Sequence, residues 1–244
     1  MNVCVVFAVS LATALATGLG VIPVAAAHMD ERRSMGLSRS LAAGFMIGAS
    51  AGLFYEGARE DTLATAAGCV VGAAFIYVTK ILLERSNLGH VGNLKGARGM
   101  TALLVIGVMT VHSLTEGVAL GVSFAGEGSL GILIAIAIAI HNIPEGVAIS
   151  LTLVPFGERP WKAAAWSIFS SLPQPLMAVP AYLAVRTFRP LLAAGLGFAG
   201  GAMLWMVWTQ LLPEIIQDQE RARNVAVLAL SAAAMIGIEL AIGL

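Results

Sequence analysis

The sequence predicts an all-α, polytopic membrane protein with eight transmembrane helices. Of its 244 residues, 58% are hydrophobic and only 11% are charged, whereas about 25% of the residues in an ordinary soluble domain are charged. Apolar stretches of about 20 residues, the length that crosses a hydrocarbon core about 30 Å thick, recur along the whole chain. These observations exclude a soluble globular enzyme. Because the links are short, we expect a single transmembrane domain over residues 1–244.

Eight apolar stretches are long enough to be spans. In chain order they are Val3–Ala26, Leu41–Ala58, Leu63–Leu83, Met100–Phe124, Leu130–Val154, Trp161–Val185, Leu191–Leu212 and Val225–Leu244. In the fifth, Ile and Ala alternate over Gly131–Ile140 with the period of a strand, but the length and the membrane setting favour a helix. Glycines at four-residue spacing, which let membrane helices pack closely, occur at Gly44, Gly48, Gly52, Gly68, Gly72, Gly117 and Gly121.

Charge predicts the orientation of the spans. The links after spans one, three, five and seven hold eleven of the 14 Lys and Arg residues, and the links after spans two, four and six hold three. Positively charged flanks stay on the cytoplasmic side, so we expect both chain termini outside. Lys and Arg balance Asp and Glu at 14 each, which favours no nucleic-acid partner. Cys4 and Cys69 lie in apolar runs and predict neither a disulfide framework nor a thiolate metal cage.

A polar motif occurs twice inside the spans. The fourth span contains HSLTEG at residues 112–117, and the fifth contains HNIPEG at residues 141–146. An ionisable side chain inside a membrane costs several kcal/mol and is a functional-site hypothesis by default. Residues four apart lie on one face of a helix, so each His and Glu can reach one ion together. The predicted ligands are His112, Glu116, His141 and Glu145, with Ser113 and Asn142 as neutral oxygen ligands on the same faces.

The ligand types narrow the choice of ion. Imidazole, carboxylate and amide groups suit Zn²⁺, Fe²⁺, Mn²⁺ or similar first-row ions, and a cluster without Cys argues against Cu⁺. Pro144 frees the carbonyl of Ile140 inside the fifth span, which is tolerated where a helix borders a cavity. The alternative is that two His–Glu pairs only hold two helices together.

Two further polar positions stand out. Pro173 and Pro175 flank Gln174 and predict a distorted helix, with the amide of Gln174 either aimed at the same cavity or satisfied by backbone groups. Glu239 lies about one turn from the end of the eighth span, and we expect it to reach the membrane interface by snorkelling.

These features resemble the ZIP (Zrt/Irt-like) family of divalent metal transporters. The resemblance covers the whole chain, and HNIPEG at residues 141–146 is typical of the prokaryotic branch. It implies a multi-pass protein of the inner cell membrane that imports Zn²⁺ or a related ion, Fe²⁺, Mn²⁺ or Cd²⁺, as substrate rather than as cofactor. It further implies a homodimer and alternating access, with one helix group moving against another. Carried over by motif, His112, Glu116, His141 and Glu145 hold the primary ion, and Ser113, Asn142 and Gln174 border a second position.

The sequence departs from the family pattern in two spans. Gln174 stands where related prokaryotic members commonly place a glutamate, and Thr209 and Gln210 replace an acidic pair. Fewer negative charges hold a second cation less well, so we expect one bound ion rather than two. Two other functions fit the same residues: an intramembrane zinc-dependent hydrolase, and a membrane scaffold that transports no ion. The absence of a His-Glu-x-x-His arrangement weighs against the hydrolase.

Overall fold

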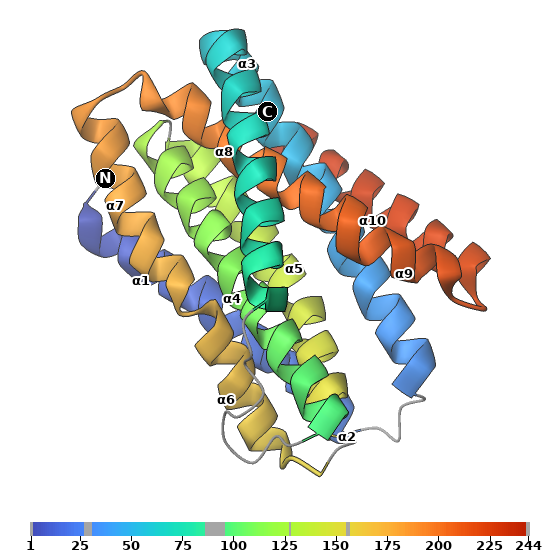
Figure 1. Cartoon of the computed structure of the whole chain (residues 1–244). Helices are drawn as coiled ribbons and strands as arrows, with labels where there is room; N and C mark the ends of the chain where they lie inside the picture. Colours follow the sequence, from blue (N-terminus) through green and yellow to red (C-terminus); the bar gives the residue numbers. More distant parts are fainter. Residues whose placement is uncertain (1, 27–30, 86–95, 127, 155–156, 243–244) are drawn as a thin grey trace.

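The computed structural model describes residues 2–26, 31–85, 96–126, 128–154 and 157–242, and its regular elements are all helical (Figure 1). The α-helices are α1 (Val3–Thr17), α2 (Val21–Ala26), α3 (Glu31–Arg85), α4 (Gly96–Ala125), α5 (Gly128–Leu153), α6 (Pro160–Ser171), α7 (Pro173–Thr187), α8 (Leu191–Met206), α9 (Leu212–Gln217) and α10 (Arg221–Ile242). A 3₁₀ turn, η1 (Gly18–Gly20), joins α1 to α2, and a π-helix, η3 (Val207–Leu211), joins α8 to α9. The all-α prediction is confirmed, including the helix over Gly131–Ile140.

Seven helical segments among the described residues are long and apolar enough to cross a membrane. One of them, Arg33–Leu83, has 51 residues, far more than the roughly 20 that one crossing needs. The helix breaks at Asp61, whose φ and ψ are −161° and 109°, and the chain then runs back (Figure 1). Asp61 Oδ1 accepts a hydrogen bond of 2.9 Å from the Ala64 N–H and so begins the second arm as a helix N-cap. Asp61 lies between the second and third predicted spans.

Glycines divide the helices into two closely packed groups. In the first group, a Cβ at Gly117 in α4 would lie 2.3 Å from the Gln174 carbonyl oxygen in α7, and one at Gly146 in α5 would lie 1.8 Å from that of Thr17 in α1. In the second group, Gly68 in α3 approaches the Ala194 carbonyl of α8 in the same way, at 2.1 Å. The seven glycines predicted to serve packing would all place a Cβ within 3 Å of a neighbouring helix, which confirms that prediction.

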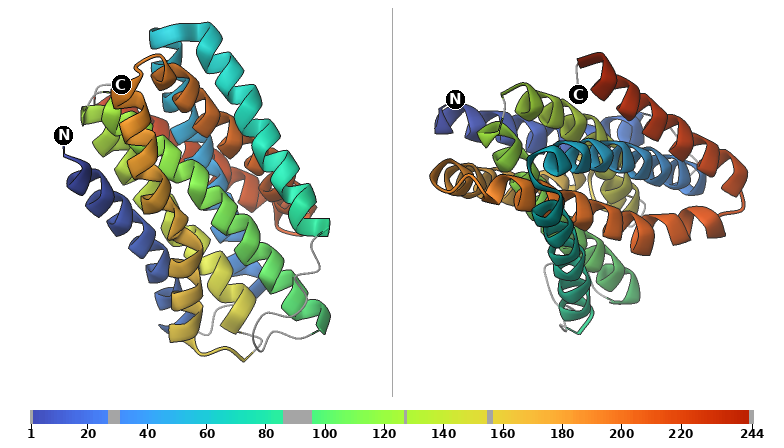
Figure 2. Two further views of the ribbon diagram at one scale, coloured as in Figure 1. Left: turned by 60° about the vertical axis from the view of Figure 1, so that its left-hand side comes forward. Right: turned by 90° about the horizontal axis from the view of Figure 1, so that it is seen from above.

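The two groups meet through side chains. The first contains α1, α4, α5, α6 and α7, and the second contains α3, α8 and α10 (Figure 2). Where a described glycine of one group faces the other, the nearest atoms are mainly side-chain carbons: Val122 for Gly195, Leu83 for Gly107 and Leu192 for Gly126. Glycines therefore bring backbones together between α4 and α7, between α1 and α5, and between α3 and α8, whereas at these three boundary positions the groups meet through side chains.

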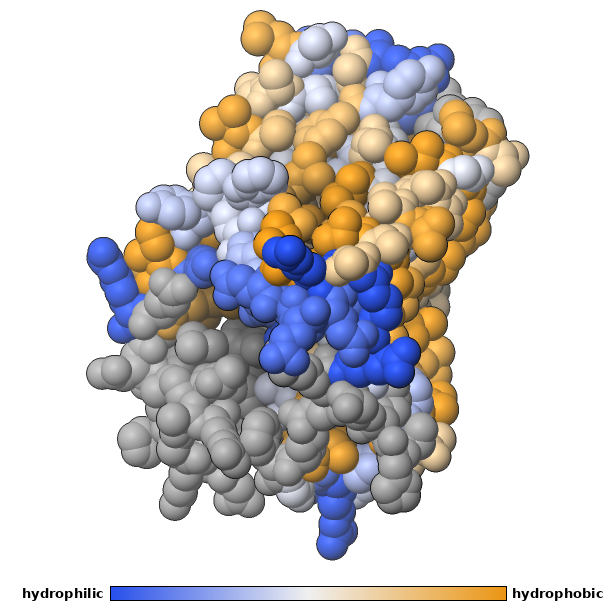
Figure 3. All heavy atoms as spheres, turned by 90° about the vertical axis from the view of Figure 1, so that its right-hand side faces the viewer, coloured by the Kyte–Doolittle hydropathy of each residue, from blue (hydrophilic) through white to orange (hydrophobic). Residues whose placement is uncertain are grey.

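The surface is largely apolar. In the view of Figure 3, a central patch of hydrophilic residues lies beside an extended hydrophobic flank. Large apolar side chains such as Leu63, Val70 and Leu230 are exposed on α3 and α10. Contiguous apolar surface of this kind marks contact with a membrane or a partner.

Glu239 corrects one expectation. It does not reach outward from α10 but is buried, at 4% exposed, against α3. Its carboxylate lies over Gly52, where a Cβ would be 2.6 Å from Oε1. Because Gly52 has no side chain, α10 packs closely enough on α3 to enclose the carboxylate, so the snorkelling prediction is wrong.

Candidate metal centre

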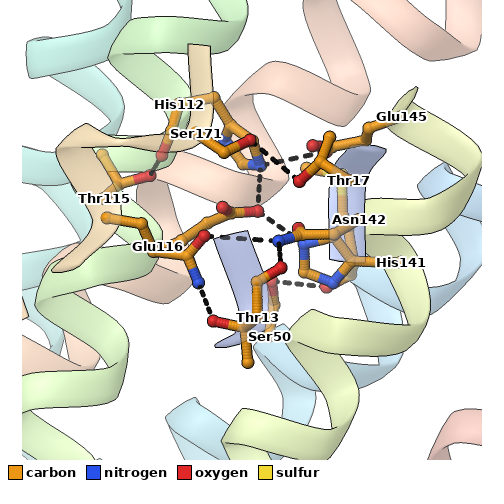
Figure 4. Close-up of polar contacts among 12 residues, drawn as sticks. Thr13, Thr17, Ser50, His112, Thr115, Glu116, His141, Asn142, Glu145 and Ser171 are labelled. Carbon is orange, nitrogen blue, oxygen red and sulfur yellow. Dashed lines mark hydrogen bonds and ion pairs between the residues drawn. The ribbon is translucent and has the colours of Figure 1, made fainter. Parts of the chain in front are cut away.

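Four predicted ligands come together at one point between α4 and α5. His112 and Glu116 lie one turn apart on α4, and His141 and Glu145 lie one turn apart on α5 (Figure 4). One ligand atom from each of the four lies within 4.8 Å of the other three, and all four side chains are buried. The prediction that the repeated motif brings these residues to one place is confirmed.

Glu116 links the two helices. Its Oε1 atom lies 2.6 Å from His141 Nε2 on α5 and 3.2 Å from His112 Nε2 on its own helix. Glu145 Oε1 lies 3.4 Å from His112 Nε2. Ligands at about 2.1 Å from an ion lie up to about 4 Å from one another, so an ion needs only small side-chain shifts to bind all four.

Two carboxylate oxygens of the cluster have few or no partners. Among the described residues, Glu116 Oε2 is buried with no partner, and Glu145 Oε1 has only the ion-pair contact of 3.4 Å with His112 Nε2. Leaving a buried polar group unpaired costs about 1–3 kcal/mol, and native proteins satisfy nearly all such groups. The cluster therefore has oxygen lone pairs that are available to coordinate a cation. This fits a metal site better than a set of hydrogen bonds that only joins two helices.

The donor set suits a divalent first-row ion. Two imidazole nitrogens and two carboxylates are ligands that Zn²⁺, Fe²⁺ and Mn²⁺ accept. Two carboxylates also balance a double positive charge, and a buried charge is tolerated only when it is compensated. The cluster therefore has the two negative charges that would neutralise a divalent cation.

Asn142 and Gln174 lie beside the cluster, on α5 and α7. Both are fully buried, and Asn142 Nδ2 donates to Gln174 Oε1 at 3.3 Å. The predicted distortion is present, because α6 ends at Ser171 and α7 begins at Pro173, which has no N–H to pair. The amide of Gln174 bonds to side chains rather than to backbone. Ser113 is also buried, and its part in metal binding stays a prediction.

Sequence reasoning missed the contribution of α1. Thr13 accepts hydrogen bonds from both amides, through its carbonyl oxygen from Asn142 Nδ2 at 2.9 Å and through Oγ1 from Gln174 Nε2 at 2.6 Å. One turn further on, Thr17 Oγ1 lies 2.9 Å from Ser171 Oγ on α6. The available signal was the spacing of Ser10, Thr13 and Thr17, which places three hydroxyls on one face of an otherwise apolar helix.

A cavity of about 180 Å³ lies one helical turn from the cluster. Val108 and Met109, before His112 on α4, line it together with Ala148, after Glu145 on α5. Its lining also includes the charged residues Arg39, Lys80 and Glu214, together with Gln210 of η3. On the opposite side of the cluster the next turns of α4 and α5 carry fully buried apolar residues: Ala119, Leu120, Ala137 and Ile138. The site thus has space toward one end of the helices and packed side chains toward the other.

Comparison with known proteins agrees with this geometry. The model of the ZIP zinc transporter family matches residues 84–243. The zinc transporter GufA of Myxococcus xanthus is 36% identical over 219 residues, which cover 84% of this chain and 86% of that protein. A candidate zinc transporter of Arabidopsis thaliana is 40% identical over 238 residues, or 96% of this chain, and the zinc transporter ZIP11 of Homo sapiens is 38% identical over 140 residues, or 54% of this chain. The chain spans 38% of the length of the Arabidopsis protein and 40% of the human one.

Proposed function

Because this chain belongs to the ZIP zinc transporter family, we propose that it carries divalent metal ions, Zn²⁺ foremost, across the cell membrane into the cytoplasm. The chain is a multi-pass membrane protein, and ZIP proteins are transporters rather than enzymes. The observation that carries the proposal is the buried cluster of His112, Glu116, His141 and Glu145. Burying four ionisable side chains between two membrane helices costs free energy. Residues of this kind inside a membrane therefore indicate a functional site.

The direction of transport is proposed from the cavity and from charge. The cavity lies one helical turn from the cluster and is lined by Arg39, Lys80 and Glu214. Arg39 and Lys80 lie at span ends that the distribution of basic residues assigns to the cytoplasm. Toward the other side, buried apolar residues close the route. This arrangement supports a state in which the site communicates with the cytoplasm, as release of an imported ion requires.

The packing of the helices supports alternating access. The metal ligands lie on α4 and α5, within the glycine-packed group that also contains α1, α6 and α7. At Gly107, Gly126 and Gly195, which lie on the boundary with α3, α8 and α10, the nearest atoms of the facing group are side-chain carbons. Side chains repack more readily than backbones in direct contact, so these positions favour movement of the first group against the second. A site carried by the moving group would then open to each side in turn.

The charge of the site supports transport of one ion per cycle. An incoming hydrated ion exchanges water for the His and Glu ligands, and the two carboxylates offset its double charge. Gln174 adds a neutral amide beside Asn142, where a carboxylate would favour a second cation. We propose one bound ion per chain, counted by metal analysis of the purified protein after equilibration with Zn²⁺.

Uptake into proteoliposomes that contain a zinc indicator tests the function directly. Wild-type protein should show saturable Zn²⁺ uptake, and competition by Fe²⁺, Mn²⁺ and Cd²⁺ should rank the ions. His141→Ala should abolish uptake, whereas His90→Ala, which removes a histidine that the sequence places in a link between spans, should leave it unchanged. Tight metal binding by the wild type without uptake would contradict transport and favour the zinc-dependent hydrolase.

The membrane and the oligomeric state complete the proposal. The family resemblance supports the inner cell membrane and a homodimer. Exposed apolar side chains on α3 and α10 provide surfaces that either lipid or a second copy can cover. The mass of the protein with a native lipid belt, measured by light scattering, would identify a dimer or a monomer.

A further inference from the structure

Thr13 is buried in α1 and is not one of the metal ligands, yet it contacts both amides that lie beside the metal centre. We propose that Thr13 is a positioning residue that fixes the orientation of Gln174 and Asn142, so that Asn142 presents an oxygen rather than an N–H group to the metal ion. This inference rests on the proposed transport function and adds to it a residue that acts without touching the ion.

The hydrogen bonds admit one orientation of each amide. Thr13 donates its single hydroxyl proton to the Ser10 carbonyl oxygen at 2.8 Å, so Thr13 Oγ1 can only accept from Gln174. The Gln174 atom at 2.6 Å from Thr13 Oγ1 is therefore the amide nitrogen. Its oxygen then faces Asn142, which must donate to it.

A second group of Thr13 fixes Asn142 independently. The carbonyl oxygen of Thr13 can only accept a hydrogen bond, so the Asn142 atom at 2.9 Å from it is Nδ2. The same nitrogen donates to Gln174 Oε1 at 3.3 Å. The carbonyl of Thr13, directly, and its hydroxyl, through Gln174, thus both require the same atom of Asn142 to be Nδ2.

The amide oxygen of Asn142, Oδ1, is the atom that could coordinate a cation. Asn142 Oδ1 is buried without a hydrogen-bond partner, and Asn142 lies next to His141 and three residues before Glu145. Residues three apart share a helix face. A carbonyl oxygen in that position attracts a cation, whereas a reversed amide would turn two N–H groups toward it. The carbonyl of Thr13 holds Asn142 in this orientation directly, and the hydroxyl reinforces it through Gln174.

The test compares three single variants of the full chain. Thr13→Val removes the hydroxyl at nearly constant volume, and Thr13→Ser keeps it. Thr17→Val is the matched control, because it removes the hydroxyl that contacts Ser171 between α1 and α6 and leaves the amides alone. Outer groups that orient metal ligands typically change metal affinity by about 10–100-fold. We expect Thr13→Val to raise the KM for Zn²⁺ uptake about tenfold, with Thr13→Ser and Thr17→Val within about twofold of wild type.

Two readouts separate positioning from a loss of stability. In the first, Co²⁺ is titrated into the detergent-solubilised protein. Its visible absorption should shift in position or intensity with Thr13→Val and stay unchanged with Thr17→Val. In the second, Thr13→Val is added to Gln174→Met. Because the hydroxyl acts through Gln174, the double variant should have the KM of Gln174→Met alone, whereas a merely structural role gives additive losses.

The outcomes distinguish this inference from the proposed function. An unchanged KM and Co²⁺ spectrum for Thr13→Val, or additive effects in the double variant, would overturn the role of Thr13. Absence of Zn²⁺ uptake by the wild type would overturn the transport function instead. The Co²⁺ titration would still test Thr13 in that case.

Discussion

Gly146 ends the second copy of the metal-binding motif, and its replacement by alanine should disturb both packing and the metal site. A Cβ at this position would lie 1.8 Å from the Thr17 carbonyl oxygen, 2.8 Å from the Thr17 carbonyl carbon and 3.3 Å from Gly20 Cα. All three atoms belong to the backbone of α1 and η1. No side-chain rotation can relieve this contact, so the helices themselves must separate.

The size of that separation follows from ordinary contact distances. Carbon and oxygen atoms that are not bonded normally stay about 3.3 Å apart, so Thr17 must retreat from α5 by about 1.5 Å. Overpacking of a tight core typically costs about 1–3 kcal/mol. Glu145 precedes Gly146 in the chain, and a shift of about 1 Å in a positioned group can cost about 100-fold in rate. We expect Gly146→Ala to lose about 1–3 kcal/mol of stability and about 100-fold in Zn²⁺ uptake.

Thermal unfolding in detergent and uptake into proteoliposomes measure the two effects. Gly237→Ala is the matched control, because a Cβ at Gly237 in α10 meets nothing within 4 Å. In an open helical position, alanine is favoured over glycine by up to about 1 kcal/mol, so Gly237→Ala should be as stable as wild type or more stable. If Gly146→Ala unfolds and transports as Gly237→Ala does, the close contact between α1 and α5 is wrong.

Three other substitutions test separate parts of the structure. Glu116→Gln keeps the shape of the residue that contacts both histidines but removes one of the two negative charges that balance the ion. Zn²⁺ should then no longer raise the thermal unfolding temperature, as a bound ligand otherwise does. An undiminished rise would contradict the role of Glu116 as a ligand. Glu239→Gln removes a buried carboxylate with an unpartnered oxygen and should leave the protein at least as stable, which a clear fall in unfolding temperature would refute. Glu214→Gln breaks a 2.7 Å ion pair with Arg39 whose side chains are 33% (Arg39) and 51% (Glu214) exposed, so its cost in thermal unfolding should stay below about 1 kcal/mol. A larger loss would contradict the view that solvent screens this pair.

The sequence predicted the elements whose signals are local. The predicted fifth span, Leu130–Val154, corresponds to α5 over Gly128–Leu153, because length and hydropathy alone decide where a chain can cross a membrane. The four ligands were predictable for a similar reason. A four-residue spacing fixes two side chains on one helix face, and the duplication of that spacing in consecutive spans places the two faces near each other.

Features that depend on contacts between distant segments were not predictable. Thr13 acts on residues 129 and 161 positions further along the chain, so its role exists only after α1 packs against α5 and α7. The 3₁₀ turn over Gly18–Gly20 lies where Gly20 meets the backbone of Gly146, another tertiary contact. Glu239 was misjudged because its burial depends on Gly52 in α3, which a reading of α10 alone does not include.

The π-helix over Val207–Leu211 was predictable only in part. A nearby proline indicates that the helix is irregular, but the sequence does not specify which form the irregularity takes. Pro213 lies two residues after its end, and it can donate no hydrogen bond to the carbonyl four residues earlier, that of Thr209. The helix must respond by kinking, breaking or widening, and widening turns are frequent at functional sites. Here the widened turn contains Gln210, which lines the cavity beside the metal centre with its Nε2 atom unpartnered. The proline therefore explains why the helix is irregular, and the contacts around the widened turn decide that Gln210 lines the cavity.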